Sequence, residues 1–335
     1  MIDISAVQYD VELMTEDGTR YLINAALLNL QWEEQINELA QRATITVANA
    51  QIGDTYIIEM AKINCVILIY GKWGEGDKTL LFEGTIWEWQ YVSSTNKELT
   101  ITVYDRLIRL QQSKDFYYFA PGMTTQAIVG KICNDHNIPF SYDWSRSVTH
   151  EKKLWSAIAV SVAIIDLLEE VRRQTGEKYV IYWRDGQLQI TGRGNNSTVY
   201  LFDTQNVVST MNKLTINNLV TEVRILGNED RDQRRPVDDT VPGDQQYGIL
   251  REIILRDRNK TLATAQAEAK TIIKERGKPE EIIQINVPDL PFMRKGDKVE
   301  VSAGNLIGFF FVAGISHYAT NRQMMLILER DMGKT

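Results

Sequence analysis

A strand, a glycine-containing loop, a second strand and a closing glycine follow one another once near each end of the chain. The first copy runs from Cys65 to Ile86 and the second from Val299 to Ile315. A segment that recurs in this way indicates a repeated supersecondary unit, although any two meanders share part of this outline and the two loops differ in length. We interpret the repeat as two copies of one small β domain.

The residues before 106 favour strands over helices. Val7 to Leu13 and Ala43 to Val47 alternate apolar and polar residues with a period of two, and Asp17-Gly18 is a tight-turn signal. About seven short strands separated by turn residues are typical of a small barrel or sandwich.

The middle of the chain changes to helical patterns. Thr124 to His136 and Val162 to Gln174 carry apolar stripes at helical spacing, and Gly176 stands where a left-handed residue would end the second helix. Asp185-Gly186 predicts a β-hairpin after that helix. Tyr117-Tyr118-Phe119 is interpreted as part of a linker.

The last third returns to β patterns around one helix. Lys213 to Leu226 is predicted as one long strand, and Thr261 to Arg276 as an amphipathic helix that ends at Gly277. The charged stretch Asn228 to Gln246 is predicted as a loop, and it is longer than most connections in compact domains. Such lengths are typical of functional or mobile loops.

These patterns together predict an α+β fold that is predominantly β, with two β-barrel or sandwich domains and a small α+β domain between them. The predicted boundaries are 1–112 for the first β domain, 113–200 for the α+β domain with two helices and a β-hairpin, and 201–335 for the second β domain with its helix at 261–276.

Charge and cysteine content narrow the classes of function. The chain has 37 Lys and Arg against 44 Asp and Glu, a net charge of −7, with both signs mixed along the sequence. Tight nucleic-acid binding needs a clustered basic surface, which this distribution disfavours. Cys65 and Cys133 cannot build a disulfide framework and suit a reducing compartment. We find neither a signal-peptide pattern nor an apolar run of about 18 residues, so we expect cytoplasmic folding and no membrane binding.

Three short motifs imitate ligand sites. Gly71 to Thr79 nearly matches a phosphate-binding loop, but an acidic residue is inserted before the lysine, and a strand pattern follows where a helix is required. Cys133 and His136 have metal-like spacing, but no second pair completes four zinc ligands. Gly192-Arg193-Gly194 leads into no helix, which dinucleotide binding needs. We predict no cofactor and no metal site.

Candidate catalytic residues are equally weak. None of the three histidines, His136, His150 and His317, stands in a recognisable nucleophile motif. The adjacent carboxylates Glu33-Glu34 and Glu169-Glu170 point apart on a strand or helix, whereas an acid–base pair of a glycosidase faces across a cleft. We predict no enzyme activity and name no catalytic residue.

Aromatic residues offer clearer candidates for contact. Trp87 and Trp89 are two residues apart, which predicts that they share one face of a strand. Core packing between domains is the plain interpretation of the aromatics. The alternative is contact between subunits, because aromatic residues concentrate at the centres of interfaces.

Several motifs also follow one another in a recognisable order. They are Phe82-Glu83-Gly84-Thr85-Ile86, Asp105-Arg106-Leu107, Pro121-Gly122-Met123-Thr124, Asn137-Ile138-Pro139, Thr175-Gly176-Glu177-Lys178-Tyr179, Asn217-Asn218-Leu219-Val220-Thr221 and Arg294-Lys295-Gly296-Asp297-Lys298-Val299. In this order the chain resembles the baseplate hub proteins of phage tails, in particular the XkdQ/YqbQ kind of Gram-positive prophages and phage-like bacteriocins. It resembles the late control D family more distantly.

The resemblance implies two tail-tube-like β domains in each chain, and a homotrimer whose six domains imitate a hexameric tube ring. It implies a structural hub of a contractile tail, which joins the tail tube protein to the trimeric spike protein. The hub would line a central channel, with tape measure protein or DNA as passing cargo. The chain would assemble in the bacterial cytoplasm and end in the baseplate of a virion or phage-like particle. Some relatives carry a hydrolase or a peptidoglycan-binding module, and we expect neither here.

Two alternatives stay open: a tail-tip protein of a non-contractile phage, and a peptidoglycan hydrolase or carbohydrate-binding module. For the hub, contacts with subunits or partners are expected in the loops 71–78 and 228–246 and at aromatic residues. The candidate interface residues are Trp73, Glu75, Asp77, Trp87, Trp89, Tyr117, Tyr118, Arg231, Arg234, Arg235, Asp238 and Asp239.

Overall fold

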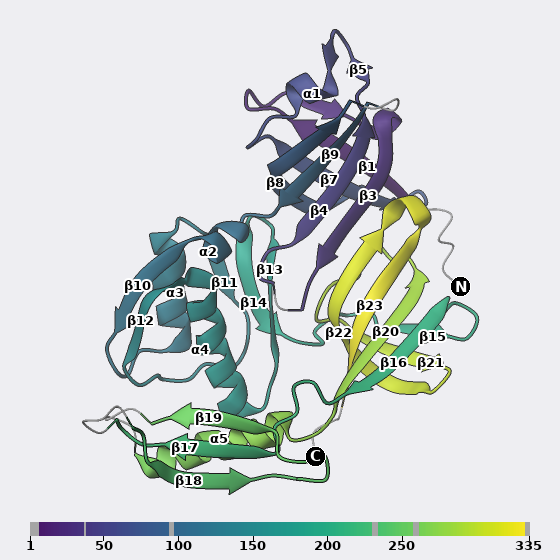
Figure 1. Ribbon diagram of the computed structural model, residues 1–335. Coiled ribbons are helices and arrows are strands. Elements are labelled where there is room, and N and C mark those ends of the chain that lie inside the picture. Colours follow the sequence, from purple (N-terminus) through teal and green to yellow (C-terminus); the bar gives the residue numbers. More distant parts are fainter. Residues whose placement is uncertain (1–6, 37, 94–96, 230–233, 257–260, 332–335) are drawn as a thin grey trace. The chain divides into compact units, whose positions relative to one another are not determined.

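Strands outnumber helices in the structure, a computed structural model that describes residues 7–36, 38–93, 97–229, 234–256 and 261–331 (Figure 1). Contacts within the chain divide it into two units. Unit 1 consists of Met1–Thr210 and Gln284–Thr335, and unit 2 of Met211–Ile283. The predicted α+β, predominantly β fold is confirmed.

The first β region consists of strands with alternating apolar residues, in the sheet order β3-β4-β9-β8-β7-β1-β2. Ile45 on β4 and Ile101 on β9 are opposite each other, and both are fully buried. Burial of such a side chain contributes about 1.5–3 kcal/mol. The bounds are β1 (Val7–Met14), β2 (Arg20–Leu22), β3 (Leu27–Glu34), β4 (Arg42–Ala48), β5 (Gln51–Ile52), β6 (Thr55–Tyr56), α1 (Ile57–Met60), β7 (Val66–Trp73), β8 (Thr79–Val92) and β9 (Glu98–Tyr104).

The α+β region packs two helices against short sheets. Thr124 caps α3 through its side chain, and Gly176 ends α4 in the left-handed conformation that the sequence predicts, with φ 75°. Asp185 and Gly186 both have positive φ, as the predicted two-residue hairpin turn requires. The bounds are α2 (Ile108–Gln112), β10 (Lys114–Phe119), α3 (Thr125–Asp135), β11 (Phe140–Tyr142), β12 (Lys153–Ala159), α4 (Val160–Thr175), β13 (Tyr179–Arg184) and β14 (Gln187–Gly192).

The second β region repeats the strand order of the first. Its order β16-β20-β23-β22-β21-β15 corresponds to β3-β4-β9-β8-β7-β1, except that β15 runs parallel to its neighbour where β1 runs antiparallel. This order supports the interpretation of two copies of one β domain, while the three-domain boundaries stay a prediction. The bounds are β15 (Tyr200–Asp203), β16 (Ser209–Thr215), β20 (Glu280–Pro288), β21 (Lys298–Ala303), β22 (Leu306–Tyr318) and β23 (Gln323–Arg330).

Unit 2 interrupts this second copy between β16 and β20. It contains a sheet in the order β18-β17-β19, and the buried Ala265 and Ala269 of α5 pack with Val223 and Ile225 of β17. The corresponding connection in the first copy, between β3 and β4, is only residues 35–41. The bounds are β17 (Glu222–Leu226), β18 (Val237–Pro242), β19 (Arg251–Leu255) and α5 (Leu262–Arg276).

Three local predictions are wrong. The single strand predicted from Lys213 to Leu226 is two strands, because the chain turns at Ile216, whose carbonyl oxygen accepts a hydrogen bond from Leu219 N. The predicted loop 228–246 contains β18, which pairs antiparallel with β17 and has a proline at its end, a position that an edge strand tolerates. The predicted linker at Tyr117 lies in β10, which pairs with β12.

β22 joins the two β regions into one sheet. Its first half pairs with β21 and its second half with β3, so that Ile315 lies opposite Glu34. The closing glycine of each repeat allows a backbone of the neighbouring strand to approach. A Cβ at Gly314 would lie 3.3 Å from the carbonyl oxygen of Glu34, and one at Gly84 would lie 2.5 Å from that of Tyr104.

Replacing Gly84 with alanine tests this role. The added methyl group would overlap the Tyr104 carbonyl oxygen, so β8 and β9 must move apart, and overpacking costs about 1–3 kcal/mol. Gly192→Ala is the control, because its added Cβ would lie 3.4 Å from the Asn195 side-chain nitrogen, at ordinary contact distance. Urea unfolding followed by circular dichroism should show a lower midpoint for Gly84→Ala than for Gly192→Ala. Equal midpoints would contradict the close-approach role.

Candidate interaction surfaces and the polar junction

The hairpin tip between β7 and β8 is one candidate surface. Glu75 and Asp77 are exposed there, and Trp73, the last residue of β7, is half-buried. Lys78 Nζ lies 2.9 Å from Glu12 Oε1 and ties the loop to β1. The sequence that resembles a phosphate-binding loop therefore connects two antiparallel strands, without the helix N-terminus that would face an anion.

Trp87 and Trp89 lie on opposite faces of β8, so the prediction of a shared face is wrong. A β-bulge at this point shifts the register between β8 and β9. Trp89 is opposite Ile101, whose side chain points into the core, whereas Trp87 packs edge-on against Tyr104 of the other face at 6.3 Å. Both side chains remain exposed, Trp87 by 44% and Trp89 by 40%.

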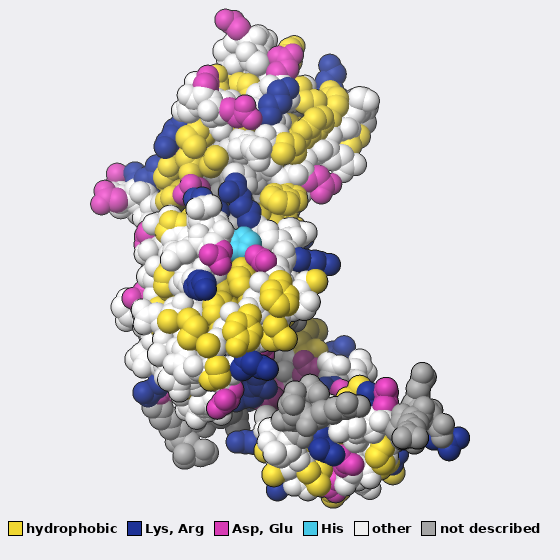
Figure 2. All heavy atoms as spheres, turned by 90° about the vertical axis from the view of Figure 1, so that its left-hand side faces the viewer, with side chains coloured by type: hydrophobic (Ala, Val, Ile, Leu, Met, Phe, Trp, Pro, Cys, Tyr) yellow, Lys and Arg dark blue, Asp and Glu magenta, His cyan; other side chains and the backbone are white. Residues whose placement is uncertain are grey.

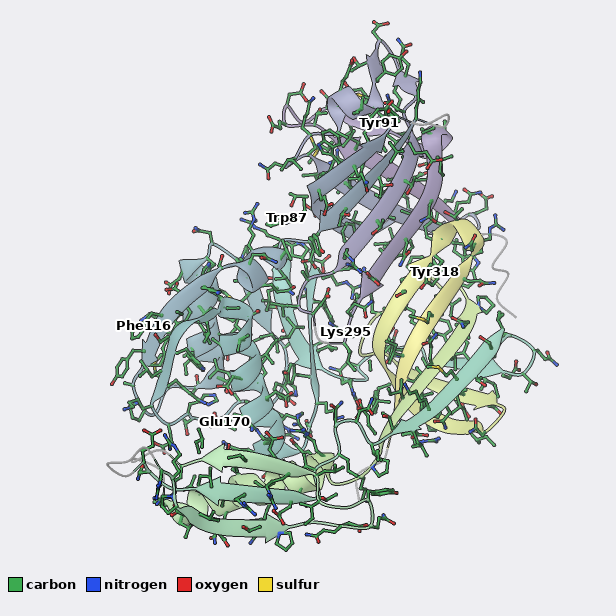
Figure 3. The ribbon with its side chains drawn as sticks, in the orientation of Figure 1. Trp87, Tyr91, Phe116, Glu170, Lys295 and Tyr318 are labelled. Carbon is green, nitrogen blue, oxygen red and sulfur yellow. The ribbon has the colours of Figure 1, made fainter. Side chains whose placement is uncertain are left out.

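Tyr117 and Tyr118 point to opposite sides of β10. Tyr117 is buried, and its hydroxyl lies 3.0 Å from His136 Nε2. Tyr118 is exposed, as are Phe116 beside it and Leu154 across from it on β12. Figure 3 shows Phe116 at the outer side of β10, and Figure 2 shows hydrophobic side chains gathered on this side of unit 1. Tyr118 therefore belongs to a small exposed apolar surface, whereas Tyr117 belongs to the core.

The arginines predicted as contact residues belong to unit 2. Arg231 lies outside the described residues, and Arg234 is exposed. Arg235 donates to Glu229 Oε1 at 2.7 Å and to the carbonyl oxygen of Gly227 at 3.2 Å. Arg235 thus holds the end of β17 to the start of β18.

The two candidate aspartates also make contacts inside unit 2. Asp238 Oδ2 accepts a hydrogen bond from Arg256 Nε at 2.6 Å, and Asp239 Oδ2 accepts one from Gln266 Nε2 of α5 at 2.6 Å. These carboxylates connect β18 to the chain after β19 and to the helix. Their role in contacts with other subunits stays a prediction.

A buried polar chain that the sequence did not suggest begins at the first residue of α3. Thr125 Oγ1 lies 2.8 Å from His150 Nε2, and His150 Nδ1 lies 3.1 Å from Glu170 Oε2, which Lys153 Nζ also contacts at 2.6 Å. Burial opposes ionisation of Glu170, but the hydrogen bonds from Lys153 and His150 outweigh it and lower the pKa. The order hydroxyl, imidazole, carboxylate is that of a nucleophile triad. Thr125 is fully buried, however, so this chain fixes α3 against α4.

Buried charges gather where β22 meets β3. Glu33 and Glu34 are adjacent at the end of β3, and they point apart as the sequence predicts. Glu33 accepts from Arg42 Nε at 2.6 Å, and Glu34 Oε1 accepts from Arg294 at 3.0 Å and from Gln41 at 3.2 Å. Both glutamates are buried, and buried charges are tolerated only when they are paired and hydrogen-bonded.

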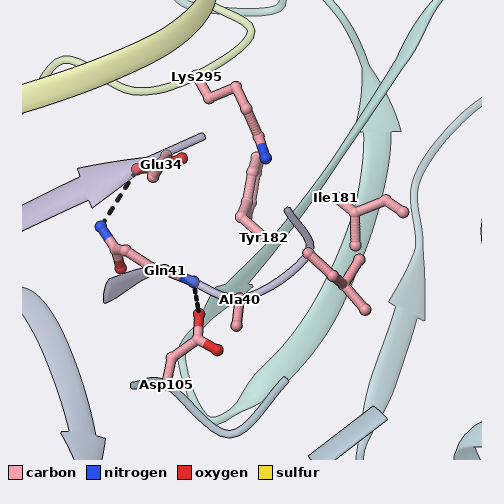
Figure 4. Close-up of a pocket in the computed structure, with 8 residues that line it drawn as sticks. Glu34, Ala40, Gln41, Asp105, Ile181, Tyr182 and Lys295 are labelled. Carbon is pink, nitrogen blue, oxygen red and sulfur yellow. Dashed lines mark hydrogen bonds between the residues drawn. The ribbon is translucent and has the colours of Figure 1, made fainter. Parts of the chain in front are cut away.

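Lys295 is the central cation of this junction (Figure 4). Its Nζ donates to the carbonyl oxygens of Gln35 at 3.2 Å and Glu38 at 3.1 Å, and its burial lowers its pKa. Burial raises the pKa of Asp105 to about 7, although hydrogen bonds from two backbone N–H groups stabilise the charged form and act to lower the pKa. Burial likewise raises the pKa of Asp297 to about 6. The junction thus contains carboxyl groups that titrate near neutral pH.

A second buried cluster at the same joint contains His317. Its Nδ1 lies 2.7 Å from Asp289 Oδ1 and its Nε2 lies 3.2 Å from the carbonyl oxygen of Met293. The ring stacks on Trp32 at 4.5 Å, and Tyr9 donates to the other Asp289 oxygen at 2.5 Å. Burial, and then the Asp289 carboxylate, raise the pKa of Tyr9. The cluster connects β1 and β3 to β22.

Local sequence patterns predict none of these junction residues as a functional site. Glu33-Glu34 is an unpromising carboxylate pair by its spacing, and Lys295 stands only within one of the motifs that carry the family resemblance. Some of their partners stand 260 residues away in sequence, as the bond from Arg294 to Glu34 illustrates, so local patterns contain no signal of these long-range pairings.

Within the described ranges, no three His, Cys, Asp or Glu residues gather in a way that could hold a metal ion. None of the helices in the described part of the chain is both long and apolar enough to cross a membrane.

A family model described as YQBQ-like matches residues 30–329. The chain belongs to the YqbQ-like family. The YqbQ protein of Bacillus subtilis strain 168, itself uncharacterized, is 24% identical over 246 residues, which cover 70% of this chain and 73% of YqbQ. The protein XkdQ of the phage-like element PBSX, from the same strain, is 23% identical over 213 residues, covering 61% and 63%. The predicted resemblance to the XkdQ/YqbQ kind is confirmed.

Solved structures share the fold of this YqbQ-like chain. A tail protein from Neisseria meningitidis MC58 has a TM-score of 0.69 at 14% identity, covering 96% of this chain and 97% of that one. A type VI secretion system component of Escherichia coli, described as structurally similar to the T4 bacteriophage tail proteins gp27 and gp5, has a TM-score of 0.54 at 11% identity, covering 90% and 73%. The fold is therefore that of tail proteins.

Asp105 makes the junction sensitive to pH. Its pKa in the folded chain, about 7, is above the ~3.9 of an unfolded aspartate, so between these values the folded state keeps a proton that the unfolded state has lost. The free energy of unfolding therefore falls as pH rises through this window, and each pKa unit corresponds to about 1.4 kcal/mol.

We expect Asp105→Asn to flatten this dependence between about pH 4 and 7, because the titrating group is gone. Urea unfolding at several pH values would measure it, with the exposed Asp77→Asn as control. A wild-type slope that survives unchanged in Asp105→Asn would show that Asp105 is not responsible.

The Tyr9 hydroxyl gives a second test of the joint. Tyr9→Phe removes a donor to the buried Asp289 carboxylate, and a buried acceptor that loses a partner costs about 1–3 kcal/mol. Tyr118→Phe, at an exposed tyrosine, is the matched control and should change the free energy of unfolding by less than about 0.5 kcal/mol. A Tyr9→Phe variant as stable as the control would refute the contribution of this hydrogen bond.

Proposed function

We propose that this chain is a structural subunit of a phage or phage-like tail, and that it acts as the baseplate hub of a contractile tail. The observation that carries the proposal is the repeated strand order of the two β regions, in a chain of the YqbQ-like family. The tail-protein fold supports the coarser part of the proposal, a tail component.

The proposed mechanism is geometric. Two like β regions in each chain and three chains give six similar parts, so a homotrimer can meet a ring of six identical subunits. β22 and β3 pair directly within each chain, which would hold the two parts at a fixed register. The hub would then present a six-part face to the tail tube protein and a threefold face to the spike protein.

The remaining partners follow from a position on the tail axis. Tape measure protein and DNA would pass through the central channel as cargo, and a chain of net charge −7 would not retain DNA. A spike partner is supported by the likeness to the type VI secretion component described with gp27 and gp5. The chain would assemble in the bacterial cytoplasm and end in the tail baseplate.

Two observations favour this structural function over hydrolysis or carbohydrate binding. The two exposed indoles of β8 lie on opposite faces, so they do not form one platform on which a sugar chain could stack. Thr125, in the arrangement that imitates a triad, is fully buried. A tail-tip role in a non-contractile phage uses the same two β regions, and sheath protein in purified particles would distinguish it from the hub.

The oligomeric state tests the hub. We expect light scattering of the purified chain alone to give three times the mass of one chain, 38.4 kDa, and electron microscopy, with or without tube and spike proteins, to show rings. A strict monomer in the presence of both partners would contradict the proposal. A charge introduced by Tyr118→Asp on the exposed apolar surface, with Glu151→Gln as a nearby surface control, would show whether that surface takes part in assembly.

A further inference from the structure

One oxygen of the junction has no hydrogen-bond partner among the described residues. Glu34 is 4% exposed, and its Oε1 is engaged by Arg294 and Gln41, whereas its Oε2 is fully buried and unpartnered. A buried carboxyl oxygen left in this state loses its hydration without a replacement, which is unfavourable. We therefore expect a hydrogen-bond donor close to Glu34 Oε2.

A donor is present close by on Lys295. Its ammonium group has three N–H bonds, and two of them are used by the carbonyl oxygens of Gln35 and Glu38. Among the described residues, the ion-pair partner of Glu34 is Arg294, and Lys295 forms no direct ion pair with Glu34. One N–H of Lys295 and one oxygen of Glu34 are therefore left over at the same junction.

Both groups line one small cavity (Figure 4). Its walls come from Glu34, the segment Leu39 to Gln41, Asp105, the β13 residues Ile181 and Tyr182, and Lys295. The space open to the centre of a water-sized sphere is about 10 Å³, close to the roughly 10–15 Å³ that one water molecule needs by the same measure.

We propose that this cavity binds a single water molecule, which accepts a hydrogen bond from Lys295 Nζ and donates one to Glu34 Oε2. Its second proton is directed to the carboxyl group of Asp105 or to another polar atom of the wall. A water with two to four polar partners is the usual occupant of a polar cavity of this size. The water completes the hydrogen bonds of both leftover groups.

The charges of the wall favour a neutral occupant. The wall carries two carboxyl groups, Glu34 and Asp105, against the ammonium group of Lys295. Asp105 is partly protonated near neutral pH, and Arg294 pairs with Glu34 from outside the cavity. A further cation would face Lys295 at close range, and an anion would face Glu34. A molecule that both donates and accepts satisfies all three groups.

The site has a structural consequence, because its walls belong to three parts of unit 1. Glu34 and Asp105 come from the first β region, Tyr182 from the α+β region, and Lys295 from the loop before β21. The three parts would thus meet through a shared water molecule, and water-mediated hydrogen bonds are nearly as favourable as direct ones.

A crystal structure of the full chain at high resolution tests the site directly. We expect one ordered peak in the cavity, within about 3.2 Å of Glu34 Oε2 and Lys295 Nζ, refining as water without residual density. An empty cavity, a direct Glu34–Lys295 ion pair, or a peak with the short distances and coordination of a metal cation would each overturn the proposal.

Solution measurements on a variant provide a second, independent test. Oxygen-17 magnetic relaxation dispersion counts long-lived internal waters. Lys295→Met keeps a side chain of similar length without its donors, and we expect it to show one such water fewer than the wild type. Lys152→Met, at an exposed lysine, should leave the number unchanged. Equal numbers for Lys295→Met and the wild type would overturn the proposal.

Discussion

The structure depends on the pairing of β22 with β3, since this contact turns two β regions into one sheet. Ordinary backbone hydrogen bonds form the pairing, but the side chains that flank it are unusual. Carboxylates and an imidazole are buried beside it, on Glu33, Glu34 and His317, and the ammonium-bearing side chain of Lys295 lines a cavity with Glu34. Buried charge contributes little net stability and instead penalises every arrangement that leaves it unpaired. The junction therefore defines one geometry between the regions, which a purely apolar contact would define less strictly.

The closing glycines of the repeat serve the same requirement. Gly84 lets the β9 backbone approach, and Gly314 lets the β3 backbone approach, at the equivalent position of β22. In the first copy the approaching strand belongs to the same β region. In the second copy it belongs to the other one. A glycine in a strand thus allows close packing within one β region at Gly84 and between the two β regions at Gly314.

The elements that local chemistry determines could be predicted from the sequence. The Asp185-Gly186 turn and the left-handed Gly176 depend on neighbouring residues alone. The bulge beside Trp87 could not be predicted, because one extra residue in a strand leaves no compositional mark and yet reverses the face of each residue that follows. The charged cluster could not be predicted either, because Arg294 and Lys295 stand 260 residues from their partners Glu34 and Gln35 in the sequence.

Unit 2 gives the duplication a consequence of its own. The long connection from β16 to β20 occupies the place that residues 35–41 occupy in the first copy. In the proposed ring, long and short connections would alternate around the circumference. A chain can therefore keep its two copies alike where six equal contacts are needed and make them unlike at this one connection. In such a ring the β regions would be related by nearly sixfold symmetry, whereas the long connections would obey only threefold symmetry. This combination suits a joint between parts of different symmetry.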